Sequence, residues 1–341
     1  MYHHAEPIEL LRELIDTPST TGDEAGVAEI LERELTAGGY TVGRQQVHPE
    51  RDNLLAIRDG ETPRLLFCTH IDTVPPHIPF RQDERTVFGR GACDTKGGIV
   101  AMLEAGRRLR AGGLTEFGFL FVVGEEVDHS GAKAARALDL HVADIILCEP
   151  TVCRVISAQK GVVKVRLVAE GRAAHSGFPH RGVSAIERLL ATLDTLRTRA
   201  WPSHPVLGQT FFNIGLIQGG VAANVLAPSA TAELMFRTVG PSDEILAAID
   251  CALVDGVRRE LLTENGPELF DVPPGYETGV ANFNTDASFL KQVGRILLVG
   301  PGDIEVAHSE HEHITIDELE RGIDLYVRLG RELLERSAAT S

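Results

Sequence analysis

The sequence predicts an α/β protein, in which a larger domain with a mixed central sheet flanked by helices is interrupted by a smaller α+β domain. Two observations predict this class. Toward both ends of the chain, short wholly apolar runs alternate with segments of helical periodicity, as in sheets covered by helices. Between about residues 161 and 267, the strand-like segments instead alternate apolar and polar residues, which is typical of strands with one exposed face.

The larger domain is predicted to contain four helices and four buried strands. Helical periodicity ended by proline or glycine predicts helices at residues 8–16, 23–37, 97–111 and 315–335. Continuous apolar runs predict strands at residues 64–69, 117–123, 144–148 and 295–299. These elements place the larger domain at residues 1–160 and 268–341.

The inserted domain, residues 161–267, has a different order of elements. Its predicted elements are a strand at 162–170, a helix at 183–199, strands at 210–220 and 229–239, and a second helix at 242–262. This βαββα order predicts a small antiparallel sheet with two helices on one face. The proline- and glycine-rich segment 265–279 is interpreted as a linker back to the larger domain.

Composition excludes several classes of partner. The 341 residues carry a formal net charge of −16, which argues against nucleic acid and anionic membranes as partners. The N-terminal residues 1–19 lack the pattern of a secretory leader, and no apolar segment reaches the length of a membrane span. Five cysteines without a C-x-x-C pair favour a reducing compartment. We therefore expect a soluble, cytoplasmic protein.

Polar residues follow the predicted buried strands at the points where the strands end. Because the ligand crevice of an α/β sheet lies outside the carboxyl ends of its strands, we expect these residues at one edge. A further carboxylate stands in the glycine-rich turn GRGACDTKGG before a helix. The residues are His70, Glu125, Glu126, Glu149, His308 and, in the turn, Asp94.

This set of side chains predicts a metal centre. Packed together without a cation, the carboxylates and imidazoles would repel one another or be desolvated at great cost. Mixed nitrogen and oxygen donors suit Zn²⁺, with Co²⁺ or Mn²⁺ as alternatives, and one carboxylate can bridge two ions about 3.5–4 Å apart. Taken singly, each residue also fits an ordinary loop position, and His311 and His313 compete with His308 as ligands.

Six segments resemble the signature segments of the M20 di-zinc peptidase and deacylase family, in order and over nearly the whole chain. They are THIDTVP, GRGACDTKGG, GEEVDHSGA, CEPT, AAHSGFPHRGVSAI and GPGDIEVAHSEHEHI. Within this family, the segments resemble those of the acetylornithine deacetylases and succinyl-diaminopimelate desuccinylases. The resemblance implies a catalytic domain with two Zn²⁺ per subunit, and an inserted lid domain through which the protein forms a homodimer.

The resemblance also implies individual roles in the larger domain. One zinc ion would be held by His70, Asp94 and Glu149. The other would be held by Asp94, Glu126 and His308, with Asp94 as the bridge. Asp72 would orient His70. Glu125 would be the general base and acid that takes a proton from water and passes it to the leaving amine.

In the inserted domain, the resemblance implies that His175 crosses the dimer interface to stabilise the oxyanion of the partner's site. Asn224 and Arg237 stand where the family has residues that grip the substrate. The chain departs from the family's Asn-x-x-Pro pattern here, because Ala227 occupies the proline position and Pro228 follows it. His180 is interpreted as a surface residue.

The substrate implied by the resemblance is an N-acyl amino acid, with N-acetylornithine first. Glu149 is more typical of the family's deacylases and of some carboxypeptidases than of its dipeptidases, and the segments CEPT, FNTDASFL and GPGDIEVAHSEHEHI resemble those of acetylornithine deacetylases. Thr285 and Asp286 would line the substrate pocket, although Thr285 equally suits a helix N-cap. The alternatives are N-succinyl-diaminopimelate, N-acetyl-lysine, N-acetylcitrulline and a dipeptide or other substrate of an M20 carboxypeptidase or dipeptidase. A non-catalytic, metal-binding relative is the alternative from a different class.

Overall fold

The computed structural model describes residues 6–336, which form two compact units. Unit 1 contains residues 6–157, 270–279 and 285–336, and unit 2 contains residues 158–269 and 280–284. The expected boundaries, after residues 160 and 267, lie within three residues of two of these crossings. The short return of residues 280–284 to unit 2 was not anticipated from the sequence.

Unit 1 is built on a six-stranded mixed sheet. Its strands, in spatial order, are β1 (Thr41–His48), β2 (Arg51–Ile57), β6 (Phe117–Val122), β3 (Leu65–His70), β7 (Asp144–Leu147) and β17 (Arg295–Leu298). The last four are parallel and are the four strands that the apolar runs predict, whereas β2 pairs antiparallel with β6. Every residue of β3, β6 and β7 is buried, as expected for strands covered on both faces.

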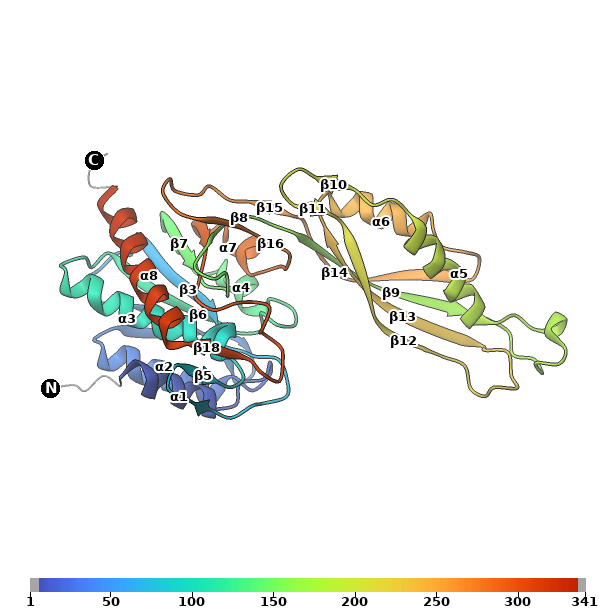
Figure 1. The fold of residues 1–341 in the computed structure, drawn as a ribbon, viewed down its shortest axis with the longest axis horizontal. Helices are drawn as coiled ribbons and strands as arrows, with labels where there is room; N and C mark the ends of the chain where they lie inside the picture. The colour runs from blue at the N-terminus through green and yellow to red at the C-terminus, as the bar shows by residue number, and fades with distance from the viewer. Residues whose placement is uncertain (1–5, 337–341) are drawn as a thin grey trace. The chain divides into compact units, whose positions relative to one another are not determined.

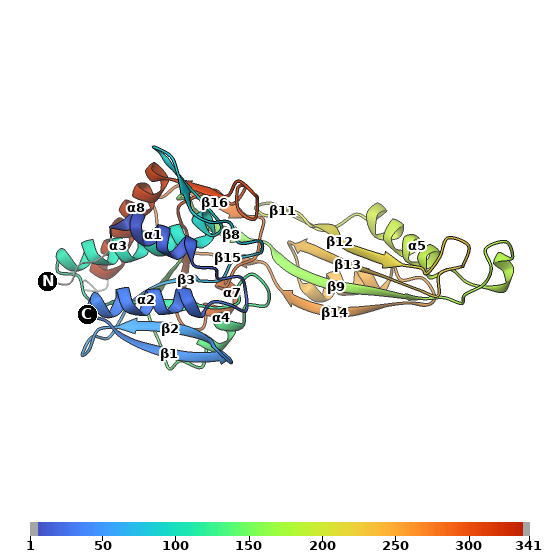
Figure 2. The ribbon, with the colours of Figure 1, turned by 90° about the horizontal axis from the view of Figure 1, so that it is seen from below.

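The four predicted helices of unit 1 are present, each within two residues of its expected bounds. They are α1 (Pro7–Asp16), α2 (Ala25–Ala37), α3 (Gly97–Ala111) and α8 (Ile316–Arg336). In Figure 1, α3 and α8 lie side by side, and Figure 2 shows α2 running along β1 and β2. Tyr326 of α8 is fully buried against Phe67 of β3, and its hydroxyl donates to the Val299 carbonyl at 3.0 Å. The helices therefore pack on a continuous apolar core above the sheet.

Unit 2 is a four-stranded antiparallel sheet with two helices on one face (Figure 1). Its strands, in spatial order, are β12 (Phe211–Gly219), β13 (Ser229–Thr238), β9 (Gly161–Glu170) and β14 (Val257–Asn265). The helices are α5 (Ala185–Thr198) and α6 (Ser242–Asp250). The hydroxyl of Ser184 begins α5 by accepting from the Glu187 N–H at 3.3 Å.

The predicted helix at 242–262 was wrong in its second half. Only 242–250 is helical, and residues 257–265 form the strand β14, so the order is βαββαβ. Gly256, with a φ of +76°, turns the chain between the two elements. β14 lies at the edge of the sheet and pairs with β9. Its apolar residues mimic helical spacing, but the turn and the pairing decide its conformation.

Shorter elements complete the chain. They are the helices α4 (Ser130–Ala135) and α7 (Ala287–Leu290), the sheet of β15 (Glu268–Leu269), β8 (Val155–Gln159) and β16 (Thr278–Ala281), the sheet of β18 (His313–Thr315), β5 (Thr86–Phe88) and β4 (Arg81–Gln82), and the ribbon of β10 (Ser203–His204) and β11 (Gly208–Gln209). The segment 265–279, interpreted as a linker, thus includes β15, and β14 and β16 each extend into it. Within residues 6–336, no helix combines the length and apolarity needed to cross a membrane.

Candidate metal centre

Three parallel strands of unit 1 deliver side chains to one edge of the sheet. His70 is the last residue of β3, Glu149 follows β7, and Glu125 and Glu126 follow β6 after Gly124, whose φ is +80°. These strands are neighbours in the order β6-β3-β7, so their carboxyl ends meet. Asp94 comes from the buried turn Ala92–Lys96 that begins α3.

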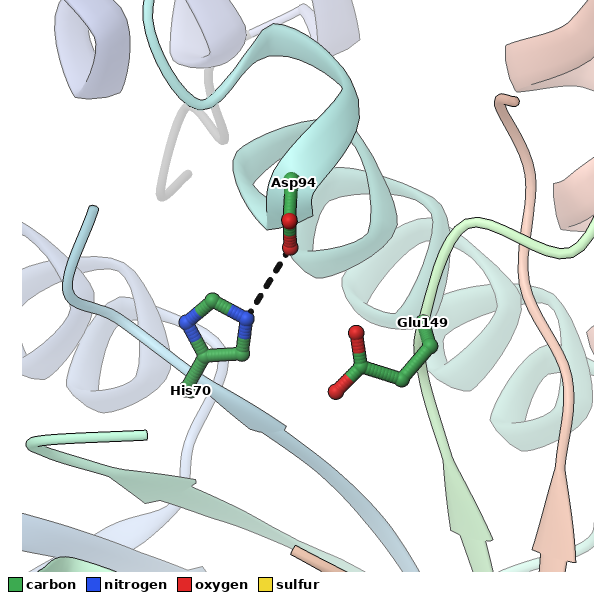
Figure 3. Close-up of side chains that lie close together, drawn as sticks. All are labelled: His70, Asp94 and Glu149. Atoms are coloured by element: carbon green, nitrogen blue, oxygen red, sulfur yellow. Dashed lines mark hydrogen bonds and ion pairs between the residues drawn. The ribbon is translucent and has the colours of Figure 1, made fainter. Parts of the chain in front are cut away.

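The first donor group consists of His70, Asp94 and Glu149, shown in Figure 3. The Nε2 atom of His70 lies 3.1 Å from Oδ1 of Asp94. The Glu149 carboxylate points toward this pair, and one ligand atom from each residue lies within 4.8 Å of the other two. Their exposed fractions are 2%, 5% and 4%. Three buried donors therefore converge on one position.

The second donor group shares Asp94 with the first. The other oxygen of Asp94, Oδ2, lies 3.3 Å from Nε2 of His308, and that nitrogen lies 3.1 Å from Oε1 of Glu126. His308 comes from the loop after β17 and adopts a left-handed φ of 61°. Each oxygen of Asp94 thus faces a different histidine, which is the arrangement that a carboxylate bridging two cations requires.

Asp72 is tied to both strand ends. The Nδ1 atom of His70 lies 2.9 Å from the main-chain carbonyl oxygen of Asp72 and 3.5 Å from its carboxylate. The carboxylate itself accepts from the backbone N–H groups of Glu125 and Glu126 at 3.1 and 3.2 Å, and from the Thr21 hydroxyl at 2.6 Å. Asp72 therefore fixes the His70 ring mainly through its backbone and fixes the Glu125–Glu126 turn through its side chain.

Glu125 stands outside both groups and belongs to a third, with His129 and Asp286. The Nδ1 atom of His129 lies 2.9 Å from Oδ1 of Asp286 and 3.6 Å from Oε1 of Glu125. The sequence analysis predicted neither a functional role for His129 nor its contact with Asp286. The only local signal was the spacing of four residues between Glu125 and His129. Thr285 is fully buried, and its hydroxyl accepts from the Ala287 N–H at 3.2 Å in a local turn. The N-cap position of α7 is Asp286, so the alternative interpretation of Thr285 as the N-cap is wrong.

His311 and His313, the alternatives to His308 as metal ligands, belong to neither donor group. His313 opens β18, and its Nδ1 lies 2.8 Å from the carbonyl oxygen of His311. Of the three histidines in this segment, only His308 belongs to a donor group among the described residues. His313 pairs with Phe88 in the antiparallel pair of β18 and β5.

Comparison with known proteins identifies the chain. Residues 66–332 match the sequence profile described as Peptidase family M20/M25/M40. The chain belongs to this family. It is therefore a metal-dependent hydrolase of the M20 group, with a fold shared by M20 catalytic and dimerisation domains.

Curated relatives of this M20 hydrolase include peptidases. It is 35% identical to a Peptidase M20 domain-containing protein of Schizosaccharomyces pombe, over 94% of this chain and 83% of the relative. It is 34% identical to a probable carboxypeptidase of Aspergillus clavatus, over 96% of this chain and 82% of the relative.

Solved structures share the fold at lower identity. A tripeptidase from Staphylococcus aureus superposes with a TM-score of 0.83 at 21% identity, covering 98% of this chain and 99% of its own. An M20 family metallo-carboxypeptidase from Sulfolobus solfataricus superposes with a TM-score of 0.78 at 14% identity, covering 97% of this chain and 99% of its own.

The donor groups of the M20 hydrolase fit divalent cations. Oε1 of Glu149 is fully buried, yet no hydrogen-bond partner for it exists among the described residues, so a buried acceptor is left for a ligand. Imidazole and carboxylate donors are those that Zn²⁺ binds. His70, Asp94 and Glu149 would hold one cation, and Asp94, Glu126 and His308 the other.

The electrostatics of the centre agree with this fit. Burial, with the nearby Glu149 and Asp286 carboxylates, raises the pKa of Glu125 well above its ordinary value, and burial likewise raises the pKa of Glu149. Burial acts to raise the pKa of Asp94 too, but hydrogen bonds from His308 and His70 lower it. Hydrogen bonds to Asp94 and Glu126 raise the pKa of His308 to about 10.

The remaining predicted residues of the M20 hydrolase lie in unit 2. His175 is exposed and pairs with Val225 in a β-bridge, while its Nδ1 accepts from the Gly177 N–H at 3.0 Å. Ser176 donates its N–H to the Asn224 carbonyl at 2.9 Å, so the His175 and Asn224 loops are adjacent. Arg237 lies on β13, opposite residues of β9 and β12. His180 is exposed, as expected.

Proposed function

We propose that this protein uses two divalent cations, Zn²⁺ in the first place, to hydrolyse a linear amide bond whose leaving amine is an amino acid. The observation that carries the proposal is the pair of donor groups that share Asp94, with the unligated Glu125 beside them. When bound, the cations would polarise the amide carbonyl and lower the pKa of a water molecule.

The chain's own residues manage the protons of this reaction. Glu125 accepts a proton from the attacking water and donates it to the leaving amine nitrogen, which suits a carboxylate whose pKa is raised by burial. His129, held by Asp286, keeps the Glu125 carboxylate at the edge of the donor groups. Asp72 fixes the backbone on which Glu125 stands.

Two substrate classes contain the same kind of scissile amide bond. The sequence resemblance favours N-acetylornithine, which releases acetate and ornithine, and the names of the relatives favour release of a C-terminal amino acid from a short peptide. In both cases an acyl carbonyl is joined to the α-amine of an amino acid. Our proposal is this shared class, with N-acetylornithine as the first specific candidate.

A substrate panel on the zinc-loaded protein tests the proposal. It compares kcat/KM for N-acetylornithine, N-acetyl-lysine, N-acetylcitrulline, N-succinyl-diaminopimelate and N-blocked dipeptides. Each N-blocked dipeptide is matched to its C-terminal amide. We expect hydrolysis of at least one class and strong preference for the free carboxylate. If N-acetylornithine ranks last, that candidate is wrong; if two cations bind but no amide is cleaved, the protein is a non-catalytic metal-binding relative.

The proposal includes a homodimer formed through unit 2. β12 is an edge strand, and its exposed apolar side chains support this assembly, since exposed apolar edges are normally covered. Phe211, Leu216 and Ile217 are 48%, 56% and 55% exposed. In such a dimer, His175 would serve the partner's site, and Asn224 and Arg237 would bind substrate.

A further inference from the structure

We infer that Glu312 is a positioning residue that holds the Asp94 turn in its metal-binding conformation. Glu312 lies four residues after His308, is 1% exposed, and comes more than 200 residues later in the chain than the turn it contacts. The inference rests on the proposed two-metal centre, because the role given to Glu312 is to position Asp94 for metal binding.

One carboxylate oxygen of Glu312 accepts hydrogen bonds from three backbone N–H groups of the turn. Its Oε1 accepts from the N–H groups of Gly91, Cys93 and Asp94 at 2.8, 3.3 and 3.2 Å. Its other oxygen, Oε2, accepts from the Arg90 guanidinium, which is itself buried and donates to the Pro76 carbonyl at 3.2 Å. The carboxylate therefore satisfies three buried N–H groups and one buried cation at once.

The turn needs such a partner because its backbone is not helical. Asp94 has φ −119° and ψ 86°, so the N–H groups around it do not enter the ladder of α3. Every residue from 90 to 98 is buried, and solvent does not replace the missing bonds. With this backbone, the two oxygens of Asp94 face His70 and His308.

Glu312 joins the segments that carry Asp94 and His308, the two donors that the second group brings together. The main-chain carbonyl of Glu312 also accepts from the Gly89 N–H at 3.1 Å, so the His308 segment and the Asp94 turn are linked by both backbone and side chain. A carboxylate behind a ligand can change metal affinity by about 10–100-fold without touching the metal. Because Asp94 belongs to both donor groups, weakening this link should affect both cations.

The test measures zinc affinity directly. Metal-free wild type, Glu312→Gln and Glu312→Asp are titrated with Zn²⁺ against a chromophoric chelator, and thermal unfolding of each metal-free protein is recorded. Glu312→Gln keeps the shape but loses the charge, and Glu312→Asp keeps the charge but withdraws it from the N–H groups. Glu104→Gln is the matched control, because Glu104 is a largely buried carboxylate bonded to Arg107 and Arg108 in α3.

We expect both Glu312 variants to fold and to bind both zinc ions about 10–100-fold more weakly. We also expect kcat to recover at saturating zinc, while Glu104→Gln keeps wild-type affinity. Unchanged zinc affinity in the folded variants overturns the inference, as does failure of both to fold, because Glu312 would then be a stability element only. The titration needs no substrate, so weaker zinc binding by the variants would support the inference even if the protein hydrolyses no amide. Conversely, amide hydrolysis by the wild type would support the proposed function even if Glu312 proves dispensable.

Discussion

At the scale of single residues, the placement of His70, Glu126 and Glu149 follows from the strands that end beside them. His70 and Glu149 could be predicted because each stands at the carboxyl end of a buried apolar run, where side chains of an α/β sheet meet. His129 and Glu312 could not, because the contacts that give them a role join distant parts of the chain. Nothing in their local sequence separates them from ordinary loop residues.

Glu125 carries the first prediction. Glu125→Ala should retain two zinc ions, since neither donor group contains the residue, and should lower kcat by about 10²–10⁴-fold or more through loss of the proton carrier. Metal analysis and steady-state kinetics of the same preparation check both halves. Glu116→Ala, at a surface carboxylate that is 54% exposed, should leave both values unchanged. A fully active Glu125→Ala protein would contradict the assignment.

The raised pKa values predict proton release on zinc binding. In the metal-free protein, hydrogen bonds to Asp94 and Glu126 raise the pKa of His308 to about 10, so its imidazole is protonated at pH 7, and burial raises the pKa of Glu149 above its ordinary value. Cations bind the deprotonated forms and must displace these protons. Zinc affinity should therefore rise with pH between 6 and about 10.

Isothermal titration at pH 7 in two buffers of different ionisation enthalpy measures this release. The binding heat should depend on the buffer at pH 7 and the dependence should shrink toward pH 10, where His308 is already half deprotonated. Equal heats in both buffers at pH 7 would show that the cluster holds no displaceable proton.

At the scale of elements, the contact between α3 and the end of β7 sets the position of Glu149. Gly98, the second residue of α3, lies against Cys148, and a Cβ added there would be 2.2 Å from the cysteine sulfur. Gly98→Ala should therefore push the helix from the strand end. We expect about 1–3 kcal/mol of destabilisation and weaker zinc binding.

Urea unfolding of the metal-free protein and a zinc titration check the Gly98 prediction. Gly266→Ala is the control, because a Cβ at Gly266 meets nothing within 4 Å. The prediction is wrong if the two alanine variants behave alike.

Prediction of elements from the sequence succeeded at α3, where the apolar spacing fits only a helix. It failed at residues 257–265, where strand pairing outweighed an apparent helical repeat.

At the scale of the whole molecule, the proposed dimer predicts complementation between two inactive variants. If His175 serves the partner's site, a mixed dimer of Glu125→Ala and His175→Ala contains one complete site. Random exchange of subunits should then restore about a quarter of wild-type activity. If His175 serves its own subunit, the mixture stays inactive.

Subunit exchange at low concentration, followed by kinetics and light scattering, distinguishes these outcomes. Leu216→Lys on the exposed edge of β12 is the companion variant, expected to give monomers with little activity. Monomers with full activity would remove the dimer from the proposal.

The sequence by itself determined the class of fold, the four parallel strands and the four long helices of unit 1, and the side chains that meet at the edge of its sheet. Periodicity and the order of strand ends are local properties, and they are enough for the fold class and for bringing these side chains to one edge of the sheet. The division into two donor groups came from the resemblance to the M20 family. Only the tertiary structure decided that Asp94 turns one oxygen to each histidine, that Asp286 holds His129 beside Glu125, and that Glu312 closes the Asp94 turn. These contacts join residues up to 222 positions apart, and such pairings depend on how the whole chain packs.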